Sequence, residues 1–320
     1  MEARTIRSDL LLLLTAAIWG FAFVAQRVGM ESVGPFTFNG IRFALGSLSL
    51  VPLLFWRPNG KKSSRNGEII AGRGGVMLRG GGLAGVFLFA GASLQQVGLV
   101  HTTAGNAGFI TGLYVVMVPM LGLFFRQRTT AGTWLGAFLA AAGLYLLSIS
   151  EHFTIAWGDF LVLVGAVFWA AHVLIIGWIS PRVAAVRLAI MQFAVCSVLS
   201  VIVAIAVEPI TTDGIRQAAI PILYGGLCSV GVAYTLQVVA QKSAHPAHAA
   251  IFLSLEAVFA AIGGWWLLDE MLGRRGMIGC ALMLAGMLLS QLWEMILRRR
   301  RPLKISVGAA GDRYHSEGSP

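Results

Sequence analysis

The chain has 320 residues, of which 57% are hydrophobic and only 12% are charged, whereas about a quarter of the residues in an average soluble domain are charged. This composition excludes an ordinary soluble protein. The formal net charge of +10 does not indicate nucleic-acid binding, because Lys and Arg lie in short connectors and in the C-terminal tail instead of gathering on one helix face.

Apolar runs long enough to cross a bilayer follow one another along the chain. A helix needs about 20 mostly apolar residues to cross the hydrocarbon core, and charged, Gly-rich or Pro-bearing breaks separate such runs. We expect ten membrane-spanning helices, over residues 9–27, 36–56, 77–99, 103–125, 131–150, 158–179, 188–207, 218–240, 246–268 and 276–297. Because the runs lack the alternation of a membrane β-barrel, the predicted fold class is an all-α integral membrane protein.

Positive charge falls almost entirely on one side of these expected helices. If the helices alternate in direction, 19 of the 24 Lys and Arg residues lie on the side that holds the N-terminus, and Arg42 lies within a span. The other side carries only Arg27, Arg216, Arg274 and Arg275. Cytoplasmic loops are enriched in Lys and Arg. We therefore expect a multi-pass protein of the inner (plasma) membrane with both termini in the cytoplasm.

The sequence also repeats itself. A shift of 150 positions pairs Asp9 with Asp159 and Trp19 with Trp169, and a shift of 142 to 143 pairs Gln95 with Gln237, Gly136 with Gly279 and Gly143 with Gly286. Each half holds five expected helices, and an odd number turns the second half upside down relative to the first. Inverted repeats of transporters provide two near-equivalent packings around a solute site near the bilayer midplane.

These observations divide the chain into four parts. We predict a cytoplasmic N-terminus at 1–8, a first repeat at 9–150, a second repeat at 151–297 and a basic, disordered cytoplasmic tail at 298–320. The tail begins with four consecutive arginines, Arg298 to Arg301, directly after the last expected helix. Such a cluster is expected to bind anionic lipid headgroups.

Several motifs follow one another in a fixed order along the chain. Each half opens with an Asp-led apolar run that contains Trp, from Asp9 to Trp19 and from Asp159 to Trp169, and Arg42-Phe43 lies in the second run. Two longer motifs are LQQVGLVHTTAGNAGFITGLYVVMVPMLG at 94–122 and SLEAVFAAIGGWWLLDEMLGRRGMIGCALMLAGMLL at 254–289. Together these motifs resemble those of the EamA domains of the drug/metabolite transporter superfamily. The resemblance covers 9–297 and implies ten helices, cytoplasmic termini and the export or uptake of metabolites.

The chain departs from the pattern of this family in two places. The first half has Arg126-Gln127 where the second half has Asp269-Glu270, so the acidic signature occurs once. Ala257 stands where similar chains often have Pro after the Glu. The second departure leaves the helix geometry at Glu256 open.

Glu256 is the deepest acidic residue, because the run 246–268 places it at the centre of a span. A charged carboxylate at that depth costs at least about 2.5 kcal/mol on insertion scales unless it faces protein or water. We predict that Glu256 binds a proton or a substrate amine, with a structural tie as the alternative. Arg42 has three open roles: pairing with Glu256, binding a substrate carboxylate, or extending its guanidinium to the outer interface.

Aromatic and polar residues within the spans are further candidates for the solute site. Trp19 and Trp169 lie near the centres of their helices, away from the interfacial belts that Trp prefers, so we expect them to line a central cavity. His172 lies near the same face as Trp169 and is either a proton relay or a core histidine with satisfied hydrogen bonds. Polar candidates, which otherwise hold helices together, are Gln95, Asn106, Thr111, Tyr114, Tyr234 and Gln237.

The sequence thus favours a secondary transporter that moves amino-acid-like or related polar and amphipathic solutes by alternating access, with export favoured on the resemblance. A lipid flippase or another solute permease is the alternative within transport. A membrane-embedded enzyme would need a cluster such as HExxH or paired deep Asp, which the sequence lacks, and a non-transporting membrane protein is the third class. Expected partners are a small-molecule substrate and membrane lipids, and transport is either coupled to protons or facilitative.

No cofactor or metal site is expected. The cysteines Cys196, Cys228 and Cys280 each lie inside an apolar run without CxxC or Cys/His spacing. We interpret them as small packing residues.

Overall fold

The computed structural model describes residues 2–55, 74–124, 130–148, 156–244, 246–271 and 273–300, and all regular structure within these ranges is helical. The expectations for the basic connector at 57–73, for Arg126-Gln127 and for the tail from Arg301 onward lie outside the described residues.

The first half of the sequence forms a bundle of long helices with one interruption. Its elements are α1 (Glu2–Gly29), α2 (Pro35–Phe55), α4 (Gly74–Leu99), α5 (Ala104–Gly112), α6 (Tyr114–Phe124) and α7 (Ala131–Ser148). The second half contains α8 (Trp157–Ile179), α9 (Ala185–Val207), α10 (Thr212–Gln217), α11 (Ala219–Leu223), the π-helix η1 (Tyr224–Tyr234), α12 (Thr235–Ala240), α13 (Pro246–Leu253), α14 (Glu256–Leu268) and α15 (Arg274–Arg300).

Eight stretches of these helices are long and apolar enough to cross a membrane. They run over Ile6–Gly29, Pro35–Phe55, Gly75–Leu99, Ala104–Phe124, Trp157–Ile179, Ala185–Val207, Ala219–Ala240 and His248–Leu268. Each coincides with one of the ten expected spans. The other two expected spans correspond to α7, whose shorter apolar stretch covers Ala131–Gly143, and to α15.

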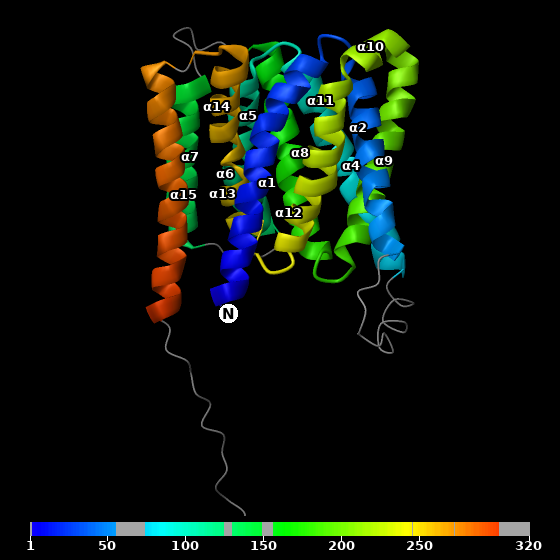
Figure 1. Cartoon of the computed structure of the whole chain (residues 1–320). Helices are drawn as coiled ribbons and strands as arrows, with labels where there is room; N and C mark the ends of the chain where they lie inside the picture. Colours follow the sequence, from blue (N-terminus) through cyan, green and yellow to red (C-terminus); the bar gives the residue numbers. More distant parts are fainter. Residues whose placement is uncertain are drawn as a thin grey trace, which may run out of the picture.

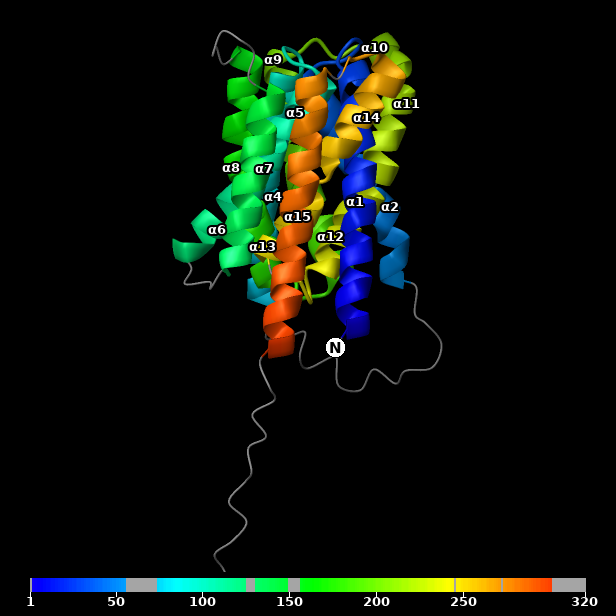
Figure 2. The ribbon, with the colours of Figure 1, turned by 90° about the vertical axis from the view of Figure 1, so that its left-hand side faces the viewer.

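The helices stand side by side in one bundle with two faces (Figures 1 and 2). The start of α1 and the end of α15 lie at one face, which we call the N-terminal face, and the connectors after α1, α4, α9 and α14 lie at the opposite face (Figure 1). Helices of the two sequence halves pack against each other throughout the bundle: α1 contacts α14, α2 contacts α9 and η1, α4 contacts α8 and α9, and α7 contacts α15.

Two of the expected spans are interrupted helices, which hydropathy did not predict. The span expected at 103–125 breaks between α5 and α6 at Leu113, and the span expected at 246–268 breaks between α13 and α14 at Ser254 and Leu255. Both breaks are tightened turns in which backbone N–H groups bond three residues back, such as Leu113 to Ile110 and Ala257 to Ser254. The second break therefore forms although Ala257 is not a proline.

A third expected span, at 218–240, is also not a regular α-helix, because its middle is the 11-residue π-helix η1. This stretch is rich in glycine and lies very close to α2: a Cβ atom added at Gly46 would overlap the Val230 side chain. Carbonyls of η1 accept hydrogen bonds from α1, at Ser229 from Trp19 Nε1 (3.2 Å) and at Ala233 from Thr15 Oγ1 (3.3 Å). π-Helices occur frequently at functional sites.

Candidate functional site

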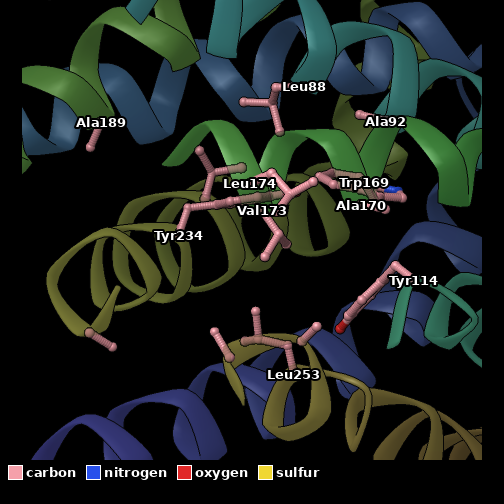
Figure 3. Close-up of a cluster of buried hydrophobic side chains, with 14 of the residues drawn as sticks. Leu88, Ala92, Tyr114, Trp169, Ala170, Val173, Leu174, Ala189, Tyr234 and Leu253 are labelled. Atoms are coloured by element: carbon pink, nitrogen blue, oxygen red, sulfur yellow. The ribbon is translucent and has the colours of Figure 1, made fainter. Parts of the chain in front are cut away.

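A buried cavity lies near the middle of the bundle, where both halves of the sequence contribute side chains. About 450 Å³ of space, open solvent at its edge included, is not filled by atoms there. The lining residues are Trp19, Ala22, Phe23, Gln26, Arg42, Gln95, Thr111, Tyr114, Trp169, Val173, Ser229, Tyr234, Gln237, Leu253 and Glu256. Figure 3 shows Trp169, Val173 and Tyr234 on one side of the space, Leu253 across from them, and the Tyr114 hydroxyl directed into it.

The three irregular segments all supply residues to this cavity. Tyr114 is the first residue of α6 and Glu256 is the first residue of α14, so each follows directly after a helix break. Ser229 and Tyr234 belong to the π-helix. Because the N-terminus of a helix carries partial positive charge, the start of α14 offsets part of the cost of a carboxylate at Glu256. Discontinuous helices shape the central sites of several transporter folds in this way.

Aromatic rings from both halves form one wall of the cavity. Tyr234 lies between the two tryptophans, with ring centroids 4.5 Å from Trp19 and 6.0 Å from Trp169. The Trp169 indole N–H donates to Gln95 Oε1 over 2.8 Å, which fixes the ring in place. This wall offers broad apolar surface to a solute, with polar groups at its edges.

Gln95 also bonds to two polar side chains other than Trp169. Gln95 Nε2 donates to Gln26 Oε1 over 3.3 Å, and Thr111 Oγ1 donates to Gln95 Oε1 over 3.4 Å. Two further lining atoms, Gln237 Oε1 and Glu256 Oε1, are buried without a hydrogen-bond partner among the described residues. The Tyr114 hydroxyl lies close enough to the Glu256 carboxyl to interact with it. Buried polar atoms normally have partners, so the two free oxygens are available to a polar solute or to water.

Arg42 and Glu256 bring a guanidinium and a carboxyl group to one cavity without forming an ion pair. Arg42 is only 2% exposed; its Nε donates to Asn39 Oδ1 over 2.9 Å, and its guanidinium lies over the rings of Phe38 and Phe43. Within the described part of the chain, no ion pair joins Arg42 to Glu256. The guanidinium therefore does not extend to the outer interface, which was one of its three expected roles.

Comparison with known proteins identifies the kind of molecule that has this architecture. A model of the EamA-like transporter family matches the chain twice, over residues 6–149 and 156–292. The chain belongs to this family. The EamA protein is accordingly a multi-pass membrane protein of a transporter family.

Relatives of this EamA protein cover most of its length. It is 32% identical over 291 residues to an "Uncharacterized transporter" of Archaeoglobus fulgidus, a match that covers 90% of this chain and 87% of the relative. It is 24% identical over 266 residues to the "Uncharacterized inner membrane transporter YedA" of Escherichia coli K12, covering 80% and 81% of the two chains. A solved crystal structure that is 17% identical superposes with a TM-score of 0.72 over 91% of this chain and 98% of that chain, and so shares the fold.

Most residues singled out from the sequence lie around the cavity of this EamA protein. Its lining includes Glu256, Arg42, the two tryptophans, Gln95, Thr111, Tyr114, Tyr234 and Gln237. His172 and Asn106 do not line it. His172 is fully buried and its Nε2 is 2.8 Å from Gln192 Oε1, and Asn106 lies in the first turn of α5, where its backbone N–H donates to Thr103 Oγ1.

Sequence reasoning missed the part of the lining that α1 provides beyond Trp19. Ala22, Phe23 and Gln26 follow Trp19 at intervals of three, four and seven residues, which is the spacing of one helix face. Gln26 could have been found from this spacing. Ser229 could not, because its contribution is a backbone carbonyl of a π-helix that hydropathy does not reveal.

Proposed function

We propose that the protein is a secondary transporter that moves small polar or amphipathic metabolites, such as amino acids, across the inner membrane. Transport would proceed by alternating access between two inverted five-helix repeats, residues 9–150 and 151–297, with export favoured over uptake. The observation that carries the proposal is a cavity at the interface of the two halves, lined by a cation, a carboxyl group and aromatic rings.

The contacts between the halves support an inverted relation between them. The sequence repeat pairs Gly136 with Gly279 and Gly143 with Gly286. At the contact of α7 with α15, Gly143 lies against the Gly279 carbonyl and Gly286 lies against the Gly136 carbonyl. Exchanging the repeat partners turns one of these contacts into the other, as a twofold relation requires. In this proposal α7 and α15 complete the ten spans.

The charge of the connectors supports an orientation in which the N-terminal face is cytoplasmic, since 19 of 24 Lys and Arg residues are assigned to that side. The cavity is then closed toward the outside by a buried cluster that includes Phe23, Val24, Leu99 and Ala104. Closure on that side supports a state whose cavity is not open to the outside.

The separation of Arg42 from Glu256 supports a zwitterionic substrate. Because neither Arg42 nor Glu256 has an ion-pair partner within the described residues, a zwitterion can satisfy both, with its carboxylate at Arg42 and its amine at Glu256. The rings of Trp19, Trp169 and Tyr234 would cover the apolar part of the solute. A charge buried without a partner is costly, so such a solute would bind in place of water.

Counterflow in proteoliposomes tests this function. Vesicles that contain the purified full-length protein are loaded with unlabelled amino acids and exposed to a labelled mixture, while the medium of overproducing cells is analysed for released metabolites. We expect exchange of at least one zwitterionic solute. If no amino acid is exchanged but a fluorescent phospholipid moves across the membrane, the protein is a flippase and the proposal is wrong. If both activities are absent, the protein is a non-transporting membrane protein.

A further inference from the structure

Glu270 ties the second half of the chain to the first at the face of the bundle opposite the N-terminal face. Its carboxylate accepts hydrogen bonds from the backbone N–H groups of Ala104 (3.0 Å) and Gly105 (3.1 Å), the first two residues of α5. The preceding residue, Asp269, has a left-handed backbone (φ 54°) that turns the chain sharply after α14. N–H groups in the first turn of a helix lack partners within the helix, so the carboxylate satisfies two of them and complements the helix dipole.

Glu208 makes an equivalent tie at a second place on the same face. It follows α9 directly, and its carboxylate accepts from the backbone N–H groups of Phe36 (2.8 Å) and Thr37 (2.7 Å) in the first turn of α2. The Thr37 hydroxyl donates a third bond over 2.7 Å. Hydrogen bonds to an ionised acceptor are roughly twice as strong as those between neutral groups, so each carboxylate forms a strong tie with only two or three hydrogen bonds.

Both ties join helices of the two halves at this face, so they hold the halves together there. The buried cluster of Phe23, Val24, Leu99 and Ala104 lies between the cavity and the face that the ties hold. Glu270 holds α5 against the end of α14, and Glu208 holds α2 against the end of α9. Neither carboxylate lines the cavity, so neither acts by touching the solute.

The repeat provides no matching carboxylates for the N-terminal face. The positions equivalent to Glu208 and Glu270 are Pro58 and Gln127, which carry no charge and lie outside the described residues. At the N-terminal face the halves are joined by the side-chain pair of Asp9 and His248, with Oδ1 and Nε2 2.7 Å apart. In the part of the chain that the structure describes, the carboxylate ties to helix N-termini therefore belong to one face, and they favour closing that face.

We propose that Glu208 and Glu270 form an outer latch: bound to the N-termini of α2 and α5 they keep the cavity closed toward the opposite face, and their release opens it. This inference rests on the proposed alternating-access function. It assigns a role to the acidic pair Asp269-Glu270, which occurs only in the second half. A latch on one side sets the resting state of the transporter to face the cytoplasm.

Thiol accessibility tests the latch without a known substrate. In a full-length chain whose Cys196, Cys228 and Cys280 are replaced by Ala, the substitution Ala22→Cys places one thiol in the cavity. Labelling with a membrane-impermeant maleimide is measured from each face, in spheroplasts and in inverted vesicles. The double variant Glu208→Gln, Glu270→Gln should label about tenfold faster from the opposite face, because a loss of about 1.4 kcal/mol, within the range for a charged hydrogen bond, shifts a two-state ratio tenfold.

Labelling from the N-terminal face separates a latch from a general loosening of the helix packing. With a latch, the cavity thiol becomes less accessible from the N-terminal face as the opposite face opens. Equal labelling of wild type and double variant, or faster labelling from both faces, overturns the latch. Gly264→Ala is a second route, because the added Cβ would overlap the Glu270 carboxyl; it should act in the same direction. Glu31→Gln, which alters an exposed carboxylate in the connector after α1, is the matched control and should leave labelling unchanged.

The outcomes distinguish this inference from the proposed function. If the wild type exchanges solute but the latch variants label normally, the latch fails and the transporter remains. If the variants shift labelling between the faces while no solute is exchanged, the latch stands and the transport proposal fails.

Discussion

Glu256 combines three properties that rarely occur together at one residue. It is 3% exposed, one of its carboxyl oxygens has no hydrogen-bond partner among the described residues, and it begins a helix in the middle of a span. A group held only to stabilise the fold would be expected to have its hydrogen bonds satisfied. The free oxygen supports the proposed role in binding, whereas the interaction of the carboxyl with the Tyr114 hydroxyl would serve a structural tie.

The substitution Glu256→Gln should separate these two roles. The amide keeps the shape of the side chain but cannot ionise. We therefore expect the free energy of unfolding in detergent to stay the same or to rise by up to about 3 kcal/mol, the cost of a charge at such depth on insertion scales. Solute counterflow should fall to background. The measurements are thermal unfolding and proteoliposome exchange on the same preparation.

Two results would contradict this prediction. A clear loss of stability in Glu256→Gln would mean that the carboxyl is a structural tie, and unchanged counterflow would remove Glu256 from the mechanism. Glu31→Gln, at an exposed position, controls for the general effect of removing a negative charge.

At the scale of helices, the sequence predicted positions well and regularity poorly. Eight expected spans coincide with helical stretches of sufficient length, because burial in lipid requires continuous apolar residues. The breaks at Leu113 and at Ser254 with Leu255 were not predicted, since a tightened turn leaves hydropathy unchanged and no proline marks either site. The π-helix was not predicted for the same reason.

The residues of the site were predicted where a repeat or a charge marked them. Glu256 and Arg42 are conspicuous within apolar runs, and the repeat pairs Trp19 with Trp169 and Gln95 with Gln237; all six line the cavity. His172, expected to be either a proton relay or a core histidine, has its Nε2 against Gln192 inside the protein. Partners of this kind depend on packing between distant helices, which sequence spacing does not contain.

The close contact between α2 and the π-helix explains the glycines there and can be tested. Gly46→Ala would force its Cβ into the Val230 side chain, and overpacking of this kind costs about 1–3 kcal/mol. We expect a lower unfolding temperature together with weaker solute exchange, because η1 carries Ser229 and Tyr234 of the cavity. Thermal unfolding in detergent measures the first effect and counterflow the second.

The matched control for this contact is Gly82→Ala in α4, where an added Cβ meets nothing within 4 Å. Because Ala is favoured over Gly inside a helix by roughly 0.5–1 kcal/mol, this variant should be as stable as the wild type or slightly more so. Equal effects of the two substitutions would show that the α2–η1 contact is not the cause.

At the scale of the whole molecule, the two halves use equivalent residues in different ways. Trp169 of the second half donates to Gln95 of the first over 2.8 Å. The repeat-related bond would join Trp19 to Gln237, but Trp19 donates to the Ser229 carbonyl and Gln237 Oε1 has no partner among the described residues. The proposed alternating access between equivalent halves would exchange their conformations. Under that proposal, the state that faces the other side contains the bond between Trp19 and Gln237 and lacks the one between Trp169 and Gln95.

This exchange predicts opposite effects for two chemically identical substitutions. Gln95→Ala removes a bond of the described state, so a thiol at Ala22→Cys should become more accessible from the opposite face. Gln237→Ala removes the bond of the alternative state, so the same thiol should become less accessible from that face. Each shift should be about three- to tenfold, since a buried hydrogen bond contributes about 0.5–1.5 kcal/mol. Glu31→Ala, at an exposed position in the connector after α1, should cause no shift, and shifts of Gln95→Ala and Gln237→Ala in the same direction would refute the exchange.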